Sequence, residues 1–202
     1  MLIGITGGIG SGKSVISTEL RSMGYKVYDT DKEAKRLIVE NAQVRKQIEA
    51  LFGYEVYKDD MYQTHIVAEK VFADKSLLAQ LNAIVHPAVK TDILRWVTLQ
   101  DSPSFRKGLG VGFYFVECAI LYQAGFDALC DKVVAVTAPE DIRLARVIAR
   151  DHSNIEKVRA RMRAQEADKD LRRADLVVNN DGTHTISELC EQILRQLHLA
   201  QR

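Results

Sequence analysis

Residues 7–14 read Gly7-Gly8-Ile9-Gly10-Ser11-Gly12-Lys13-Ser14, the pattern of a phosphate-binding loop, in which a glycine and four further residues precede Gly-Lys-Ser. The short apolar run of residues 1–6 comes before the loop, and residues 15–23 follow it with the apolar spacing of a helix. An incidental glycine-rich turn is the alternative interpretation, but strand, loop and helix stand in the order that phosphate binding requires. The stretch therefore predicts a P-loop between the first strand and the first helix.

The residues of this loop predict the binding of ATP together with Mg²⁺. Glycines allow positive φ angles and bring successive backbone N–H groups close to phosphate oxygens. We expect Lys13 to reach the β and γ phosphates as a mobile cation and the Ser14 hydroxyl to ligate Mg²⁺. The loop residues expected to contact the nucleotide are Gly8, Ile9, Gly10, Ser11, Gly12, Lys13 and Ser14.

The composition of the 202-residue chain limits the classes of protein to which it can belong. Hydrophobic residues make up 47%, which is enough for a core, and no apolar run is long enough to span a bilayer. The N-terminal segment lacks the features of a signal peptide, so we expect a cytoplasmic protein. A net charge of +1 creates no overall field that would recruit nucleic acid. The three cysteines are far apart and predict reduced, mostly buried thiols.

Helix and strand signals alternate along most of the chain. This alternation predicts a three-layer α/β fold of the P-loop NTPase and kinase type, with a mainly parallel sheet of five strands. The predicted strands are residues 1–6, 25–28, 111–116, 132–137 and 174–180.

Within residues 32–107, the strand signals stop and helical periodicity dominates from residue 32 to about residue 100. We interpret this segment as a helical subdomain, inserted into a core of residues 1–31 and 108–202, that holds the acceptor of a phosphotransferase. His86-Pro87 is expected to interrupt the last helical pattern of the insert, because proline lacks a backbone donor and restricts the preceding residue. A histidine in such a place is more often a structural corner than an acid or base.

Acidic residues stand at the ends of two predicted strands. Asp29 and Asp31 follow residues 25–28, at the edge of the sheet where open α/β folds keep their ligands. Either aspartate could instead cap the helix that begins near residue 32. Glu117 ends another strand, where a P-loop protein would place a second Mg²⁺ ligand, direct or through water. The alternative for Glu117 is an ion pair or an ordinary loop carboxylate.

Arginines gather on two consecutive helical segments within residues 143–165. In the first segment, Arg143, Arg146 and Arg150 are spaced by three and four residues and so share a helical face. The second segment carries Arg159, Arg161 and Arg163. A solvated face is the ordinary interpretation, but clustered guanidinium groups also describe a lid that closes over ATP and neutralises the transferred phosphoryl group. We assign Arg146 and Arg150 to such a lid and the others to the surface.

The last predicted strand leads into the turn Asn180-Asp181-Gly182. The amides and carbonyls of this turn are placed where they could recognise an adenine. On position alone, Asn180 is our candidate for that contact. The residues that follow have the apolar spacing of a closing helix that covers the sheet.

Taken in order, these motifs resemble those of dephospho-coenzyme A kinases, and the resemblance covers nearly the whole chain. The P-loop alone is generic, whereas the ordered set is specific. The set comprises Thr6 to Ser14, Asp29-Thr30-Asp31, Ala34-Lys35-Arg36, Phe52-Gly53, Val71-Phe72, His86-Pro87, Ile120-Leu121-Tyr122, Arg146, Arg150-Asp151, Arg161, Gln165, Ala174-Asp175 and Asn180. The resemblance implies transfer of the γ-phosphoryl group of ATP to the ribose 3′-hydroxyl of dephospho-coenzyme A, the last step of coenzyme A synthesis. It also implies a P-loop kinase core, a helical substrate domain and an arginine lid.

Phosphoryl transfer needs positioning and charge stabilisation more than covalent chemistry, and from this we hypothesise roles for individual residues. Asp31 would orient the ribose hydroxyl and accept its proton as the new bond forms. The acceptor-binding residues would be Asp31, Lys35, Arg36 and His86. The catalytic residues would be Asp31, Lys13, Arg146 and Arg150, and the metal ligands Ser14 and Glu117. The chain departs from the usual family pattern at Val15, Ala119, Gln123 and Arg143.

Two other functions compete with this interpretation. Another small-molecule P-loop kinase, such as a nucleotide or nucleoside kinase, shares the core motifs, but the helical insert favours dephospho-coenzyme A. A nucleotide-dependent switch would carry an Asn-Lys-x-Asp signature and an Asp-x-x-Gly segment after the metal-binding strand, and neither is present. We expect a small-molecule acceptor, no nucleic-acid or membrane partner, and a monomer or weak homo-oligomer.

Overall fold

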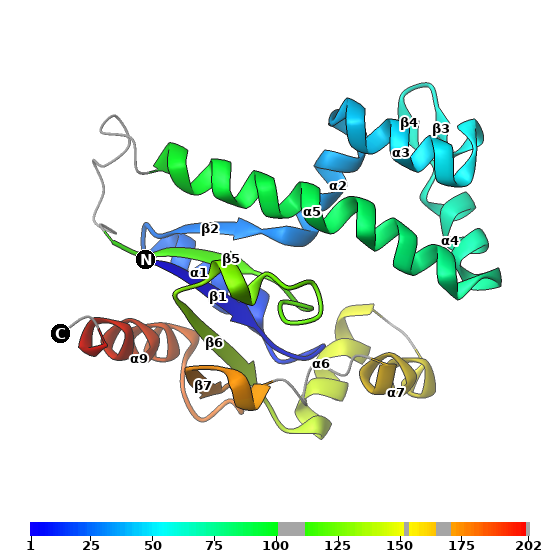
Figure 1. Ribbon diagram of the computed structural model, residues 1–202. Helices are drawn as coiled ribbons and strands as arrows, with labels where there is room; N and C mark the ends of the chain where they lie inside the picture. The colour runs from blue at the N-terminus through cyan, green and yellow to red at the C-terminus, as the bar shows by residue number, and fades with distance from the viewer. Residues whose placement is uncertain (101–111, 152–153, 165–170, 201–202) are drawn as a thin grey trace. The chain divides into compact units, whose positions relative to one another are not determined.

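The computed structural model describes the chain apart from residues 101–111, 152–153, 165–170 and 201–202. The chain divides into two compact units (Figure 1). The core unit comprises Met1–Tyr28 and Pro103–Arg202, and the helical unit comprises Asp29–Ser102. The predicted boundary after residue 31 lies near this division, and the one at residues 107–108 falls outside the described residues.

A parallel sheet of five strands organises the core unit, as the alternating sequence signals predicted. The strands are β1 (Leu2–Thr6), β2 (Lys26–Asp29), β5 (Tyr114–Glu117), β6 (Lys132–Thr137) and β7 (Leu176–Asn179). They lie in the order β2-β5-β1-β6-β7, and β1 pairs in parallel with both β5 and β6. All residues of β1 are buried, which explains its almost continuous apolar sequence. The predicted strand at 111–116 begins at Tyr114 in the structure, and its first residue lies outside the described part.

Helices pack against this sheet and fix the glycine-rich loop between them. The helices and 3₁₀ turns of the core unit are α1 (Lys13–Ser22), η2 (Asp127–Leu129), α6 (Glu140–Asp151), α7 (Ile155–Ala164), η3 (Leu171–Arg173) and α9 (Ile186–Leu199). α1 and α9 pack together, and Ile16 and Leu20 of α1 share one buried cluster with Leu189 and Ile193 of α9 (Figure 1). The loop therefore begins in the central strand and ends in a helix that is itself held by the core.

The helical unit is built around one long helix. Its elements are α2 (Thr30–Glu40), α3 (Ala42–Phe52), η1 (Tyr54–Val56), β3 (Tyr57–Lys58), β4 (Met61–Tyr62), α4 (Thr64–Ala73) and α5 (Lys75–Gln100). α2, α3 and α4 all pack against α5, whose buried residues are Val85, Val89 and Ile93 (Figure 1). Although α5 is long, the described residues contain no helix with the combined length and apolar character needed to cross a membrane.

The expectation that the insert contains no strands is wrong at one hairpin. β3 and β4 pair in antiparallel fashion, with Tyr57 opposite Tyr62. The turn between them is Asp59-Asp60, with φ angles of 51° and 61°. Aspartate tolerates this left-handed conformation better than most residues, and it suits a tight hairpin turn. Strands this short leave no alternating pattern in a sequence, so only the turn residues could have indicated them.

The expected interruption at His86-Pro87 is also wrong, because α5 continues through Pro87. Pro87 has no N–H group, so the carbonyl of Ala83 loses its usual helical donor. The buried side chains of Val85 and Val89 lie on either side of this defect and hold the helix against its neighbours. His86 is partly buried within the helix, and burial lowers the pKa of its imidazole.

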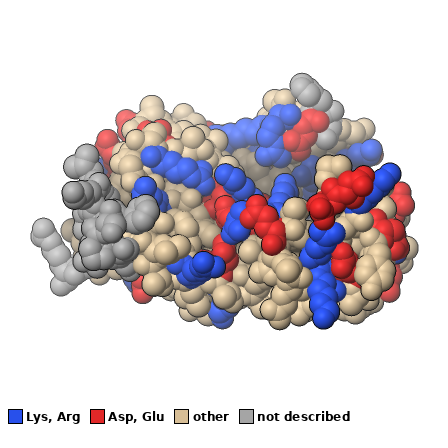
Figure 2. All heavy atoms as spheres, turned by 90° about the horizontal axis from the view of Figure 1, so that it is seen from above, with Lys and Arg blue, Asp and Glu red and all other residues tan. Residues whose placement is uncertain are grey.

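Charged side chains of both signs are intermixed on the face drawn in Figure 2. Ion pairs account for part of this mixing: in the helical unit, the guanidinium group of Arg36 contacts the carboxylates of Glu33, Glu40 and Asp92. The intermixed pattern agrees with the net charge of +1.

Candidate functional site

The glycine-rich loop needs its glycines because other backbone and side-chain atoms approach it closely. Gly10 has a φ of 79° and Gly12 a φ of 93°, a region that residues with a side chain rarely adopt. A Cβ atom on Gly10 would lie 2.5 Å from the carbonyl oxygen of Arg143, and one on Gly12 would overlap the side-chain amide of Asn180. The loop is thus packed tightly against α6 and against the residue that follows β7.

Lys13 begins α1 directly after the loop. Its ammonium group makes no hydrogen bond or ion pair with any described residue. The first turn of α1 contains no acidic side chain, so the positive end of the helix dipole is not neutralised from within the helix. Backbone N–H groups, a helix N-terminus and an unpaired ammonium group together suit a ligand that carries several negative charges.

Ser14 and Glu117, both predicted as metal ligands, are in direct contact. The Ser14 hydroxyl donates a hydrogen bond to Oε1 of Glu117 over 2.6 Å. Glu117 ends β5 and is only 7% exposed. A hydroxyl and a buried carboxylate are the hard oxygen donors that Mg²⁺ prefers, and Mg²⁺ in phosphotransferases takes most of its other ligands from phosphates and water. The described residues contain no cluster of three His, Cys, Asp or Glu side chains that would form a closed metal cage.

Asn180, the candidate for adenine recognition, is 4% exposed and uses its side chain within the protein. Its Nδ2 donates to the carbonyl of Ser11 over 2.9 Å. Arg146 donates from Nη1 to the Asn180 carbonyl over 3.0 Å and from Nη2 to its Oδ1 over 3.3 Å. The side chain therefore ties the P-loop to Arg146 of α6, and whether it also contacts adenine stays a prediction.

Replacing Asn180 with alanine distinguishes its structural role from the predicted contact with adenine. The change leaves the Ser11 carbonyl without its donor, so we expect the free energy of unfolding to fall by about 1–3 kcal/mol. We expect the ratio of kcat/KM for ATP to kcat/KM for GTP to stay within about twofold, because the contacts of the side chain are structural. Asn179→Ala is the matched control, since Asn179 is exposed and its side-chain amide donates a hydrogen bond to the neighbouring Asp181. A large drop in the ATP-to-GTP ratio at unchanged stability would instead assign Asn180 to adenine.

Asp151 organises the arginines at the junction of α6 and α7. Arg150 donates to it from Nε and Nη2 over 2.6 and 3.1 Å, and Arg161 donates from Nη1 over 3.0 Å. The hydrogen bonds from Arg150 and then from Arg161 lower the pKa of Asp151 to about 2, so the carboxylate stays ionised at neutral pH. Arg146 lies on the same helix but is bound to Asn180 instead.

An apolar cluster connects the P-loop to the same two helices. Leu144 and Val147 of α6 and Val158 of α7 are buried together, and Ile9 of the loop packs against them. With the contact between Gly10 and Arg143, α6 therefore meets the loop at two points. The predicted lid arginines are carried by helices that touch the phosphate-binding loop, and the residues 152–153 and 165 of the predicted lid lie outside the described part.

The two aspartates after β2 have different surroundings in the helical unit. Asp29 is the N-cap of α2, and its carboxylate accepts a hydrogen bond from the backbone N–H of Lys32 over 3.0 Å. Asp31 lies in the first turn of α2, where its side chain is exposed and makes no cap. Of the alternatives that the sequence left open, capping thus applies to Asp29, whereas the carboxylate of Asp31 has no hydrogen-bond or ion-pair partner among the described residues.

The remaining predicted acceptor residues also lie in the helical unit. Lys35 is exposed on α2, one turn after Asp31, and so shares a helix face with it. Arg36 is surrounded by Glu33, Glu40 and Asp92, and these contacts raise its already high pKa further. A guanidinium with three carboxylate partners is less available to a phosphate than Lys35 is.

Sequence reasoning assigned no role to Asp151, although it noted the pair Arg150-Asp151. An aspartate directly after an arginine gives no sign of the second arginine that it binds ten residues later. The inward role of Asn180 was missed for the same reason: its partner Ser11 is 169 positions away in the chain.

The chain matches known families over most of its length. A family model described as “CoaE: Dephospho-CoA kinase” matches residues 1–185. The dephospho-CoA kinase of Porphyromonas gingivalis is 40% identical over 186 residues, which cover 91% of this chain and 88% of that relative. The dephospho-CoA kinase of Salinibacter ruber is 42% identical over 183 residues, which cover 90% of this chain and 89% of the relative.

Solved structures with the same fold include “TT1252 from Thermus thermophilus”, with a TM-score of 0.79 and 33% identity, covering 100% of this chain and 97% of that one. A dephospho-CoA kinase from Campylobacter jejuni has a TM-score of 0.70 at 24% identity, with coverage of 100% and 98%. A shikimate kinase from Acinetobacter baumannii has a TM-score of 0.57 at 16% identity, covering 100% of this chain and 94% of that one. The last two similarities concern the fold alone.

Proposed function

The chain belongs to the dephospho-CoA kinase family, and from this premise we propose how its residues divide the work of the reaction. The enzyme transfers the γ-phosphoryl group of ATP to the ribose 3′-hydroxyl of dephospho-CoA, which gives CoA in the final step of its biosynthesis. The observation that best supports our assignment of the donor site is the contact between Ser14 and Glu117, next to a glycine loop whose lysine has no partner among the described residues. Phosphoryl transfer depends mainly on positioning and charge stabilisation, and this arrangement suits both.

On the donor side, the backbone N–H groups from Gly8 to Ser14 hold the phosphates, and Lys13 contacts the β and γ phosphates. Lys13 suits this role because its ammonium has no partner among the described residues and therefore need not break an ion pair to bind. Ser14 and Glu117 would hold Mg²⁺, which supplies positive charge to the phosphate oxygens.

On the acceptor side, Asp31 orients the ribose hydroxyl and takes its proton. Its exposed carboxylate, which makes no cap on α2, supports this role. Lys35, on the same helix face, contacts the acceptor's phosphates. Arg36 remains a proposed acceptor residue, although Glu33, Glu40 and Asp92 make it less available than Lys35. His86 stays a predicted acceptor residue, partly buried in α5.

Arg146 and Arg150 act as the lid arginines that neutralise the phosphoryl group in transfer. The two arginines have different hydrogen-bond partners. Arg146 donates to Asn180 beside the loop, whereas Arg150 is exposed and donates to Asp151. We therefore expect Arg146 to be the more permanent part of the site.

Replacing Arg150 with alanine should lower kcat by about 10²-fold or more, with a much smaller change in KM for ATP. The reason is that the guanidinium interacts most strongly with charge that develops in the transition state. Steady-state kinetics with varied ATP check this result, and Arg159→Ala is the matched control because Arg159 is exposed on α7. A change confined to ATP affinity would count against a lid role for Arg150.

One assay tests the function itself. Purified protein is incubated with ATP, Mg²⁺ and, in separate reactions, dephospho-CoA, adenosine, AMP or 4′-phosphopantetheine. We expect phosphate to be transferred to dephospho-CoA far faster than to any other acceptor. Preferential phosphorylation of AMP or adenosine would favour a nucleotide or nucleoside kinase instead. We also expect the enzyme to act in the cytoplasm, where ATP is available, as a monomer or weak homo-oligomer.

A further inference from the structure

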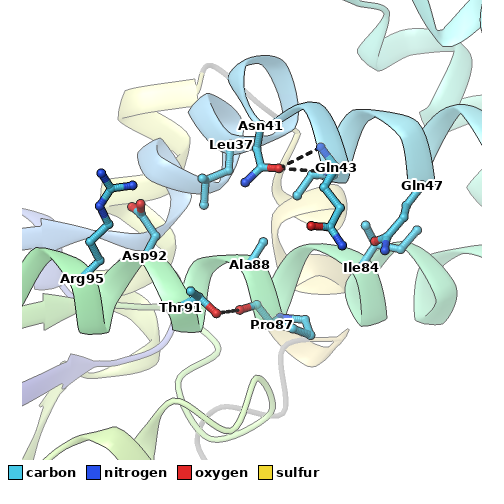
Figure 3. A pocket seen from close by; sticks show the side chains of 11 residues that line it. Leu37, Asn41, Gln43, Gln47, Ile84, Pro87, Ala88, Thr91, Asp92 and Arg95 are labelled. Atoms are coloured by element: carbon cyan, nitrogen blue, oxygen red, sulfur yellow. Dashed lines mark hydrogen bonds between the residues drawn. The ribbon is translucent and has the colours of Figure 1, made fainter.

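The helical unit contains a pocket with a volume of about 310 Å³, within the range of small-ligand sites. It lies between α5 and the corner where α2 meets α3 (Figure 3). From the α5 side it is lined by Ile84, Pro87, Ala88, Thr91, Asp92 and Arg95, which recur at spacings of three and four residues and so form one helix face. The other wall is formed by Leu37, Asn41, Gln43, Val44 and Gln47.

The lining combines an apolar floor with side-chain amides. Leu37 and Val44 are buried, and Ile84, Pro87 and Ala88 extend the apolar surface. Gln43 and Gln47 lie one turn apart on α3, and Figure 3 shows both amides on the pocket side of that helix. Asn41 accepts two hydrogen bonds from the start of α3 through Oδ1, which leaves its NH₂ group as a donor. This wall offers donors and acceptors to a ligand that carries amide groups along an aliphatic chain.

The end of the pocket that lies away from Ile84 carries positive charge (Figure 3). Arg95 lies at this end, exposed and without a hydrogen-bond or ion-pair partner among the described residues (Figure 3). Asp92, one turn earlier, is paired with Arg36 over 2.8 Å, so its carboxylate already has a cationic partner other than Arg95. A guanidinium that has no partner among the described residues is suited to a phosphate group.

We propose that this pocket holds the pantetheine arm of dephospho-CoA, with Arg95 binding the diphosphate that joins the arm to the nucleoside. The proposal rests on the proposed function and adds to it the subsite for the part of the acceptor that does not react. The arm carries two amide groups, a branched aliphatic segment and a terminal thiol, which correspond to the amide wall and the apolar floor.

The dimensions of the helical unit agree with this placement. Ile84 and Arg95 are separated by a rise of about 16 Å along α5, and an extended pantetheine arm has the length of about four peptide residues, roughly 14 Å. Along α2, Asp31 precedes the first pocket residue, Leu37, by about 9 Å of helix rise, which the ribose and the diphosphate can cover. α2 therefore presents, in order, a carboxylate for the reacting hydroxyl, Lys35 for phosphate and the wall of the pocket.

The first experiment fills the pocket. Ala88→Leu places a larger side chain in the apolar floor, and Ala79→Leu is the matched control, exposed on the opposite face of the same helix. We expect Ala88→Leu to raise KM for dephospho-CoA by about tenfold or more and to leave KM for ATP within about twofold, whereas Ala79→Leu changes neither. An unchanged KM for dephospho-CoA in folded Ala88→Leu protein would overturn the proposal. Absence of transfer to dephospho-CoA by the unmodified chain would overturn the proposed function instead.

A second experiment needs no catalytic activity and also covers the case in which Ala88→Leu does not fold. Gln47→Cys places a thiol at the far end of the pocket, and Lys46→Cys places one on a neighbouring exposed face of α3. Both variants and the unmodified chain are treated with dephospho-CoA whose thiol is activated as a mixed disulfide with thionitrobenzoate. The engineered thiolate attacks the sulfur of the arm, the new disulfide forms, and thionitrobenzoate leaves with the electron pair.

We expect Gln47→Cys to form this adduct about tenfold faster than Lys46→Cys, as measured by mass spectrometry. We also expect excess S-methyl dephospho-CoA, which has no free thiol to consume the probe, to slow the reaction. The unmodified chain reports the background from its own cysteines, of which Cys118 and Cys190 are buried. Equal rates at the two engineered positions, or no protection by S-methyl dephospho-CoA, would place the arm elsewhere.

Discussion

Replacing Lys13 with alanine is expected to reduce kcat/KM for phosphoryl transfer by at least about 10²–10³-fold, which is the usual effect of removing one group that stabilises transition-state charge. The ammonium of Lys13 has no partner among the described residues, and it stands at a helix N-terminus with no acidic side chain in its first turn. Alanine therefore removes a charge that no neighbouring side chain replaces. The measurement is the formation of CoA from dephospho-CoA by chromatography, together with ADP release in a coupled assay.

The loss should not come from unfolding. Because the Lys13 ammonium makes no hydrogen bond or ion pair with the described residues, the thermal unfolding midpoint of Lys13→Ala should stay close to that of the unmodified chain. Lys26→Ala is a suitable control, since Lys26 is exposed on β2. If Lys13→Ala formed CoA at a near-normal rate, the P-loop interpretation of residues 7–14 would have to be abandoned.

Replacing Asp31 with asparagine is expected to lower kcat by about 10²–10⁴-fold, the usual contribution of a general base. Asparagine keeps the size of the side chain and its ability to accept a hydrogen bond, but it cannot take up the proton of the ribose hydroxyl. KM for dephospho-CoA should change little, because the hydroxyl can still be oriented. Initial rates at varied dephospho-CoA concentration provide both constants.

Asp29 offers a matched control two positions away. Its carboxylate caps α2 by accepting from the N–H of Lys32, so Asp29→Ala should cost about 1 kcal/mol of stability and leave kcat nearly unchanged. The two variants are therefore expected to show opposite effects, one on turnover and the other on stability. Near-normal turnover in Asp31→Asn would mean that Asp31 only favours the start of α2 electrostatically.

The parts of the fold that the sequence predicted well are those whose cause is local. The P-loop follows from glycine conformation and the adjacent helix start, and each buried strand of the sheet follows from an uninterrupted apolar run. The two wrong predictions of secondary structure concern features that leave only a weak signal in the sequence. The β3–β4 hairpin has only Asp59-Asp60 to mark it, and the effect of Pro87 on α5 was outweighed by buried neighbours on the same helix.

The candidate site was predicted residue by residue but not as a set of contacts. Position at a strand end suggested Glu117, yet only the pairing of β5 with β1 brings it within 2.6 Å of Ser14. The sequence allowed either aspartate to be a cap and favoured Asp29, and the start of α2 made Asp29 the cap and left Asp31 exposed. The pocket beside α5 left no motif at all, because its walls come from three helices.

The sequence by itself therefore determined the phosphate-binding loop, the order of strands and helices along the chain, and the types of residue available for chemistry. Each of these depends on backbone conformation and periodicity over a few consecutive residues. The tertiary structure alone decided that Asn180 ties Ser11 to Arg146, that Asp151 joins Arg150 to Arg161, and that an amide-lined pocket opens on α5. These contacts join residues that are distant in the chain, and they arise only when packing of the apolar core brings the elements together.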